Sequence, residues 1–209
     1  MPCRRRVCPW CSRRVAASTR DGIAPRLRQF SDVVQFTSSL ESSHDLTQAW
    51  SDHQRAISRF SRNGWLTGRT AGWFRATETT HSADHGWHVH SHWLLFHENA
   101  LELRRLVSEL PQHWIQSAHA EALSASTRGQ HAAMSADIAE SVRYVTKGLM
   151  EPSRRTDRQT PGDILRSFQA GGAEAAELWA ELEGFTTAKR RRWTASGGCL
   201  RGTTRIENR

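Results

Sequence analysis

The chain has 209 residues, 37% of them hydrophobic, and carries a net charge of +8 at pH 7, with an isoelectric point of about 10.5. This length suits one domain with extensions, and a strongly basic balance is typical of proteins that bind nucleic acids. No segment approaches the roughly 18 consecutive apolar residues of a membrane-spanning helix, and the N-terminus lacks the apolar region of a secretion signal. We therefore expect a cytoplasmic protein that binds no membrane.

The first 28 residues are basic and hold three of the four cysteines. Cys8 and Cys11 have the spacing of a zinc knuckle and Cys3 precedes them, so the three thiolates could hold a structural Zn²⁺. Cys199 and His44 are candidates for a fourth ligand, and reduced cysteines without metal are the alternative. Two groups of arginines are expected to hold phosphates without reading base sequence: Arg4, Arg5, Arg6, Arg13 and Arg14 near the N-terminus, and Arg190, Arg191 and Arg192 near the C-terminus.

Hydrophobic periodicity predicts the elements of the first half. Residues 32–40 read as a strand and residues 42–60 as an amphipathic helix, followed by a glycine-containing turn region. Residues 73–81 and 87–96 read as two strands joined by a short polar turn, which predicts a β-hairpin.

The second half is predicted to be largely helical. The expected elements are a helix over 100–123 interrupted near Pro111, a loop over 124–132, a helix over 135–149 capped by Ser135, and a polar linker over 150–161. Two short helices broken at Gly171–Gly172 follow over 162–185, before a basic tail. We therefore divide the chain into a cysteine-containing segment (1–28), a core (29–150) and a helical, basic extension (151–209).

Three of the 11 histidines occupy alternate positions of one predicted strand, His88, His90 and His92. Successive side chains of a strand point to opposite faces, so the three imidazoles share one face. Two such histidines can reach one metal ion, from the pair 88 and 90 or the pair 90 and 92. Glu78 on the partner strand could add a carboxylate oxygen. A site of two histidines and a carboxylate leaves positions open for substrate oxygens.

The only tyrosine of the chain, Tyr144, lies on the predicted helix with Glu140 four residues before it and Lys147 three residues after it. Residues at these spacings share a helix face. The purely structural interpretation is an amphipathic helix whose tyrosine packs its ring on the core. Beside a metal site in a basic chain, however, the phenol could attack a phosphodiester. Lys147 would favour the phenolate, and Glu140 could act as the base of a second step.

The segments WFRATETTHSADHGWHVHSHWLLF and ESVRYVTKGL resemble the core of the HUH endonucleases that initiate rolling-circle plasmid replication, in particular those of GC-rich actinobacteria. The elements CPWC near the N-terminus and TPGDIL downstream also resemble these initiators, so the similarity covers residues 3–201.

The resemblance implies an α+β fold with a central antiparallel sheet and helices packed on one face, a ferredoxin-like HUH core. It implies Mg²⁺ or Mn²⁺ at His90 and His92, with Glu78 or His88 as a further ligand. It also implies Tyr144 as nucleophile with Lys147 beside it, and Glu140 as a hydrolytic base. The implied activity is nicking and joining of a single-stranded or hairpin origin in the bacterial cytoplasm, alongside host helicase and polymerase. A relaxase or transposase of the same chemistry, and a zinc-stabilised DNA-binding regulator without catalysis, are the alternatives.

Overall fold

The computed structural model describes residues 7–62, 64–147, 150–153, 155–187 and 193–195. The helices are α1 (Pro9–Leu27), α2 (Leu46–Arg62), α3 (Ala100–His119), α4 (Ile138–Val145), α5 (Pro161–Gln169) and α6 (Ala173–Thr187), with a 3₁₀ turn at Thr127–Gly129. The strands are β1 (Val33–Ser39), β2 (Gly72–Ser82), β3 (Gly86–Phe96), β4 (His131–Ser135) and β5 (Trp193–Ala195). No helix among these residues is long and apolar enough to cross a bilayer.

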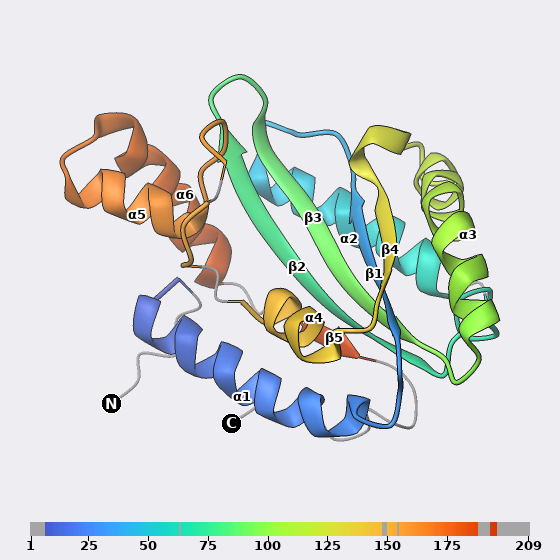
Figure 1. Cartoon of the computed structure of the whole chain (residues 1–209). Helices are drawn as coiled ribbons and strands as arrows, with labels where there is room; N and C mark the ends of the chain where they lie inside the picture. The colour runs from blue at the N-terminus through green and yellow to red at the C-terminus, as the bar shows by residue number, and fades with distance from the viewer. Residues whose placement is uncertain (1–6, 63, 148–149, 154, 188–192, 196–209) are drawn as a thin grey trace.

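The five strands form one antiparallel sheet in the order β4-β1-β3-β2-β5 (Figure 1). This confirms the predicted α+β class and the hairpin of β2 and β3. The prediction that helices cover one face was wrong, because α1 and α4 pack on one face while α2 and α3 pack on the other. Strand β3 lies at the centre, and its residues are apolar on both faces toward its C-terminal end, so both faces need a cover.

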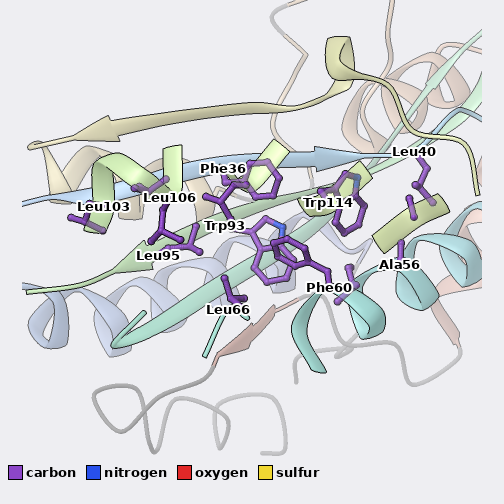
Figure 2. Close-up of a cluster of buried hydrophobic side chains, with 14 residues drawn as sticks. Phe36, Leu40, Ala56, Phe60, Leu66, Trp93, Leu95, Leu103, Leu106 and Trp114 are labelled. Carbon is purple, nitrogen blue, oxygen red and sulfur yellow. The ribbon is translucent and has the colours of Figure 1, made fainter. Parts of the chain in front are cut away.

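The larger apolar cluster lies between the sheet and helices α2 and α3 (Figure 2). Phe36 and Trp93 reach it from neighbouring strands, and Phe60 of α2 meets Trp93 edge-on with ring centroids 5.2 Å apart. Leu106 and Trp114 of α3 complete it. Helix α3 runs without a break through Pro111, so the predicted interruption was wrong. Burial of its apolar stripe offsets the roughly 3 kcal/mol that an interior proline costs.

The second apolar cluster joins α1 and α4 to the opposite face of the sheet. Ile23 and Leu27 of α1 pack with Val142 and Val145 of α4, and with Leu94 of β3. Helix α1 falls within the segment that the sequence marked only as basic and cysteine-containing. This packing holds α4, and with it Tyr144, against the central strand.

The far end of the hairpin is covered by α5 and α6, which are separated at Gly171–Gly172 as predicted. The Glu181 carboxylate of α6 accepts a hydrogen bond from the Trp87 indole at 2.8 Å and one from the first backbone N–H of α2, at Leu46, at 2.9 Å. Leu182 and Ile164 add apolar contacts with Trp87. The C-terminal helices therefore share a core with the hairpin.

The segment before α4 differs from the prediction. Residues 131–135 form the edge strand β4, so Ser135 ends a strand and does not cap the helix. Asp137 is the N-cap, with its side chain accepting from the Glu140 N–H at 2.8 Å. An aspartate at this position satisfies an orphan donor and complements the helix dipole, which explains why α4 begins there.

Candidate metal and nucleophile site

Strand β3 carries two kinds of side chain on the face that α1 and α4 cover. His88, His90 and His92 alternate along the first part, and the same face continues with Leu94 and Phe96. The prediction that the three histidines share one face is therefore confirmed. The apolar part is buried under the two helices, and His90 and His92 of the imidazole part line an open cleft beside α4.

Glu78 of β2 lies directly opposite His90 in the antiparallel register. Its Oε2 is 3.8 Å from His90 Nε2 and 3.7 Å from His92 Nε2. One ligand atom from each of these three side chains falls within 4.8 Å of the others, and no other such group occurs among the described residues. Two imidazole nitrogens and a carboxylate oxygen this close form a set that could hold one divalent ion.

The positions of the three imidazoles favour His90 and His92, rather than His88 and His90, as the pair that could bind a metal ion. His88 lies outside the three-residue group, with its ring stacked on His90 at 5.3 Å and its Nδ1 3.4 Å from Ser42 Oγ. His92 is held by the Thr37 hydroxyl, which is 3.1 Å from its Nδ1, so Nε2 faces Glu78. Such a hydrogen bond on the far nitrogen orients a metal-binding imidazole.

The surroundings of His88 and His90 disfavour the protonated form of both imidazoles. Burial and the neighbouring His92 lower the pKa of His90 to about 3. Burial, with smaller contributions from His90 and Arg158, lowers the pKa of His88 to about 3. A metal ion binds the deprotonated imidazole. The Nε2 atoms of His90 and His92 both lie within 3.8 Å of Glu78 Oε2, so the residues present fit a bound cation.

Ser91 stands between the two histidines in β3. It points to the opposite face, where it is fully buried. Its Oγ is 2.8 Å from His53 Nε2 and 2.9 Å from Thr77 Oγ1. Ser91 therefore joins a hydrogen-bonded triad on the face of the sheet opposite to His90 and His92.

Helix α4 brings the tyrosine to this group. Val142 and Val145 are buried, which turns Tyr144 outward along the cleft with 41% of its surface exposed. Its ring meets His92 edge-on at a centroid distance of 4.9 Å. Lys147 places its Nζ 4.8 Å from the Tyr144 ring centroid and 3.1 Å from Glu78 Oε2. The structure therefore brings together the residues that the sequence nominated from two distant segments.

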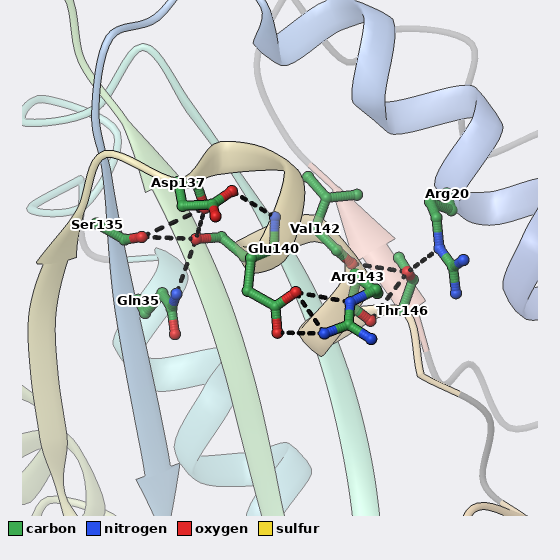
Figure 3. A network of polar contacts seen from close by, with 9 residues as sticks. Arg20, Gln35, Ser135, Asp137, Glu140, Val142, Arg143 and Thr146 are labelled. Atoms are coloured by element: carbon green, nitrogen blue, oxygen red, sulfur yellow. Dashed lines mark hydrogen bonds and ion pairs between the residues drawn. The ribbon is translucent and has the colours of Figure 1, made fainter.

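Glu140 is also at the cleft but is engaged in an ion pair. Its carboxylate accepts two hydrogen bonds from Arg143, at 2.6 and 2.8 Å (Figure 3). Both residues are exposed, so this is a weak pair by the usual energetics of surface salt bridges. The carboxylate is accessible to solvent, and its predicted role as a base stays a prediction.

The cleft around the site has a volume of about 440 Å³. One wall is the metal-ligating face with Tyr144 and Lys147, and the other includes residues 151–153, 155, 158, 160 and 161. The sequence marked this second stretch as a linker, yet its Gln159 forms a two-hydrogen-bond bridge with His81 at the edge of β2. Arg20 of α1 also lines the cleft, and neither Arg20 nor Arg158 was among the expected DNA-binding residues.

The other candidate residues lie elsewhere. Cys8 is the N-cap residue of α1 and Cys11 is buried in its first turn, while Cys3 and Cys199 are outside the described residues. Arg13 and Arg14 are exposed on α1, and the Arg14 guanidinium lies 4.7 Å from the Trp10 ring centroid. Arg4, Arg5, Arg6, Arg190, Arg191 and Arg192 are also outside the described residues. The zinc knuckle and the arginine contacts to DNA stay predictions.

Comparison with known proteins gives one family. Residues 1–101 match the family described as Replication protein. No curated protein and no solved structure matches the chain. The matched stretch contains Glu78 and all three histidines of β3, so the candidate metal site lies inside it, whereas Tyr144 and Lys147 lie outside it. Over residues 1–101 the chain is therefore similar to the Replication protein family.

Proposed function

We propose that this chain nicks and rejoins single-stranded DNA at the origin of a rolling-circle plasmid, through a phosphotyrosine at Tyr144. The observation that carries the proposal is the convergence of the Glu78–His90–His92 group with Tyr144 and Lys147 in one cleft. The match to a family of replication proteins supports DNA as the substrate. The host would be an actinobacterium, and the reaction would take place in its cytoplasm.

In the first step the Tyr144 Oη bonds to phosphorus and the bond from phosphorus to the 3′ oxygen breaks. The phenol proton passes to water, and the departing oxygen takes a proton to become a free 3′-hydroxyl. The tyrosine keeps the 5′-phosphate in a diester, which conserves the bond for later rejoining. A host polymerase would extend the 3′-hydroxyl while a host helicase unwinds the duplex.

Lys147 serves the attack in two ways. Its cationic Nζ next to the Tyr144 ring favours the phenolate and the negative charge that develops on phosphorus oxygens. A Mg²⁺ or Mn²⁺ ion at Glu78, His90 and His92 would supply Lewis acidity toward the same oxygens. His88, stacked on His90, would shield the group from water on its far side.

In the second step a 3′-hydroxyl attacks the phosphotyrosine and releases Tyr144, which closes the DNA strand. Glu140, one turn before the nucleophile on α4, would accept the proton of the attacking hydroxyl or water. Opening of its surface ion pair with Arg143 would cost little, because exposed pairs contribute about 1 kcal/mol or less.

The proposal is tested by trapping the adduct. Wild-type protein with Mn²⁺ is incubated with 3′-labelled single strands tiled across the replicon, because the tyrosine keeps the 5′-phosphate of the 3′ fragment. We expect a labelled, SDS-resistant protein band, and its loss in Tyr144→Phe. Lys147→Gln should slow the band without abolishing it. An adduct that persists in Tyr144→Phe, or wild-type protein that forms none on any strand, would refute the assignment.

A further inference from the structure

The cleft carries more positive charge than the chemistry of the metal site uses. Four arginines line it, Arg20, Arg143, Arg155 and Arg158. Two of them are neutralised: Arg143 by Glu140, and Arg155 by Asp157 through hydrogen bonds of 2.8 and 2.7 Å. No carboxylate of the described residues lies within ion-pair distance of the other two.

Arg158 lies at the His88 end of the imidazole row. The backbone N–H of His81 donates to Gln159 O at 2.9 Å and the Gln159 N–H donates to His81 O at 2.7 Å. Since side chains alternate along extended chain, the neighbours of Gln159 face the side of the sheet opposite to His81, which is the histidine side.

Arg20 lines the cleft beside the helix that carries the tyrosine. It reaches from α1 to α4, and its Nε donates to Thr146 Oγ1 at 3.3 Å (Figure 3). Thr146 is adjacent to Lys147 in the sequence, so the guanidinium is anchored by one nitrogen next to the lysine of the site. Its remaining N–H groups have no ion-pair partner among the described residues.

The wall between the two arginines contains a further polar group that lacks a partner. Thr80 lies on the metal-ligating face of β2, across from His88 in the register, and its Oγ1 is buried with no hydrogen-bond partner in the described structure. From His88 to His92 the row of imidazoles spans about 13 Å at roughly 3.3 Å per residue. Glu78, His90 and His92 thus share the cleft with one arginine beside the His88 position and another beside α4.

We propose that Arg20 and Arg158 are the phosphate-binding ends of a channel for one DNA strand, which they hold on either side of the scissile phosphate. Resting on the proposed function, this assigns the substrate path: the backbone enters at one arginine, crosses the Glu78–His90–His92 group and leaves at the other. Guanidinium groups bind phosphate through paired hydrogen bonds, and an arginine without a carboxylate partner has these donors available. Arg143 and Arg155, already paired, contribute little.

The test measures binding without chemistry, in the Tyr144→Phe background, with a fluorescein-labelled oligothymidylate and a titration of salt. Each phosphate contact with a single strand contributes about −0.7 to the slope of log K against log salt. Arg20→Ala and Arg158→Ala should each reduce the slope by about 0.7 and weaken binding about 10-fold. Because each arginine would contact a different phosphate, the two losses should add, and the slope of the double variant should fall by about 1.4.

The matched control is the double variant Arg155→Ala, Asp157→Ala, which removes an ion pair from the same segment without changing net charge. This double variant should keep the salt-dependence slope of the Tyr144→Phe parent. Arg158→Lys should keep most of that slope. Thermal unfolding of each variant verifies that the fold is retained. Unchanged slopes for Arg20→Ala and Arg158→Ala would overturn the channel even if the adduct forms. Loss of slope together with absence of any adduct would leave the channel in place and remove the nicking chemistry instead.

Discussion

The candidate metal site predicts different effects for a ligand, Glu78, and for His88, an imidazole on the same face that lies outside the ligand group. Glu78 is replaced by glutamine, and His88 by glutamine as the matched control on the same face. The observable is the rise in melting temperature on adding Mn²⁺ to the metal-free protein. Because Glu78 contributes an atom to the three-residue group and His88 does not, only the first change should weaken the response.

The magnitude follows from linkage. With Mn²⁺ at 100 times the wild-type Kd, binding stabilises the fold by about 2.7 kcal/mol, which raises the melting temperature of a chain of this size by roughly 5–11 °C. Loss of one ligand that weakens binding about 10- to 100-fold leaves a stabilisation of only about 1.4 to 0.4 kcal/mol by the same relation. His88→Gln should retain the full rise.

Differential scanning fluorimetry gives the shifts, and calorimetric titration of Mn²⁺ gives the Kd values. A full rise in Glu78→Gln would remove the carboxylate from the ligand set. A rise that disappears in His88→Gln but persists in His92→Gln would move the site to the other pair of histidines. The absence of any rise in wild type with either Mn²⁺ or Mg²⁺ would refute the site itself.

Three further perturbations act on the fold around the site. Burial and the Arg75 charge lower the pKa of His53 well below its usual value; the unfolded state then binds the extra proton, so stability falls as pH drops below about 6.5, by up to 1.4 kcal/mol per pH unit. His53→Gln should reduce the pH dependence of the free energy of unfolding, measured with urea, by this amount over that range. An unchanged pH dependence would contradict the buried neutral imidazole. Leu106→Ala should cost about 2–5 kcal/mol in the same assay, because Leu106 is 1% exposed, whereas Leu101→Ala on the exposed side of α3 should stay within about 0.5 kcal/mol; equal costs would contradict the packing of α3. Val142→Ala should lower the free energy of unfolding by about 1.5 kcal/mol. It should also slow adduct formation roughly 10- to 100-fold, because Val142 packs α4 in the position that holds Tyr144, while the Mn²⁺-induced rise in melting temperature stays intact. A normal rate would show that this contact does not position Tyr144.

The histidine site could be predicted from the sequence because its signal is local. Alternation along β3 places His90 and His92 on one face, and a short hairpin brings Glu78 opposite them. The contact of Tyr144 with this site has no local signal in the sequence, because no spacing rule connects residue 144 to residue 92. It was nominated by resemblance and by the Glu140 and Lys147 spacing, and the structure supplied the contact.

The missed elements lacked the signals on which such predictions depend. The buried stripe of α1 includes Cys11, Ala16 and Thr19, small or polar residues that do not register as an apolar period. Strand β4 has five residues, none of them fully buried, at the sheet edge, so alternation is too short to recognise. The cleft wall at Arg158 depends on a bridge to His81, 78 positions earlier in the chain, which no local pattern reveals.

One strand explains why the folding of this chain and its chemistry cannot be separated. The apolar residues of β3 alternate between two cores, with Trp93 and Leu95 toward α3 and Leu94 and Phe96 toward α1. A register slip of one residue would send every side chain to the other face. It would put the imidazoles under α2, where unpaired buried polar groups are costly, and aim a tryptophan at Tyr144. The packing that excludes this slip therefore also holds the imidazoles beside the Tyr144 phenol. A variant that weakens either core near β3 should consequently impair nicking before it unfolds the protein.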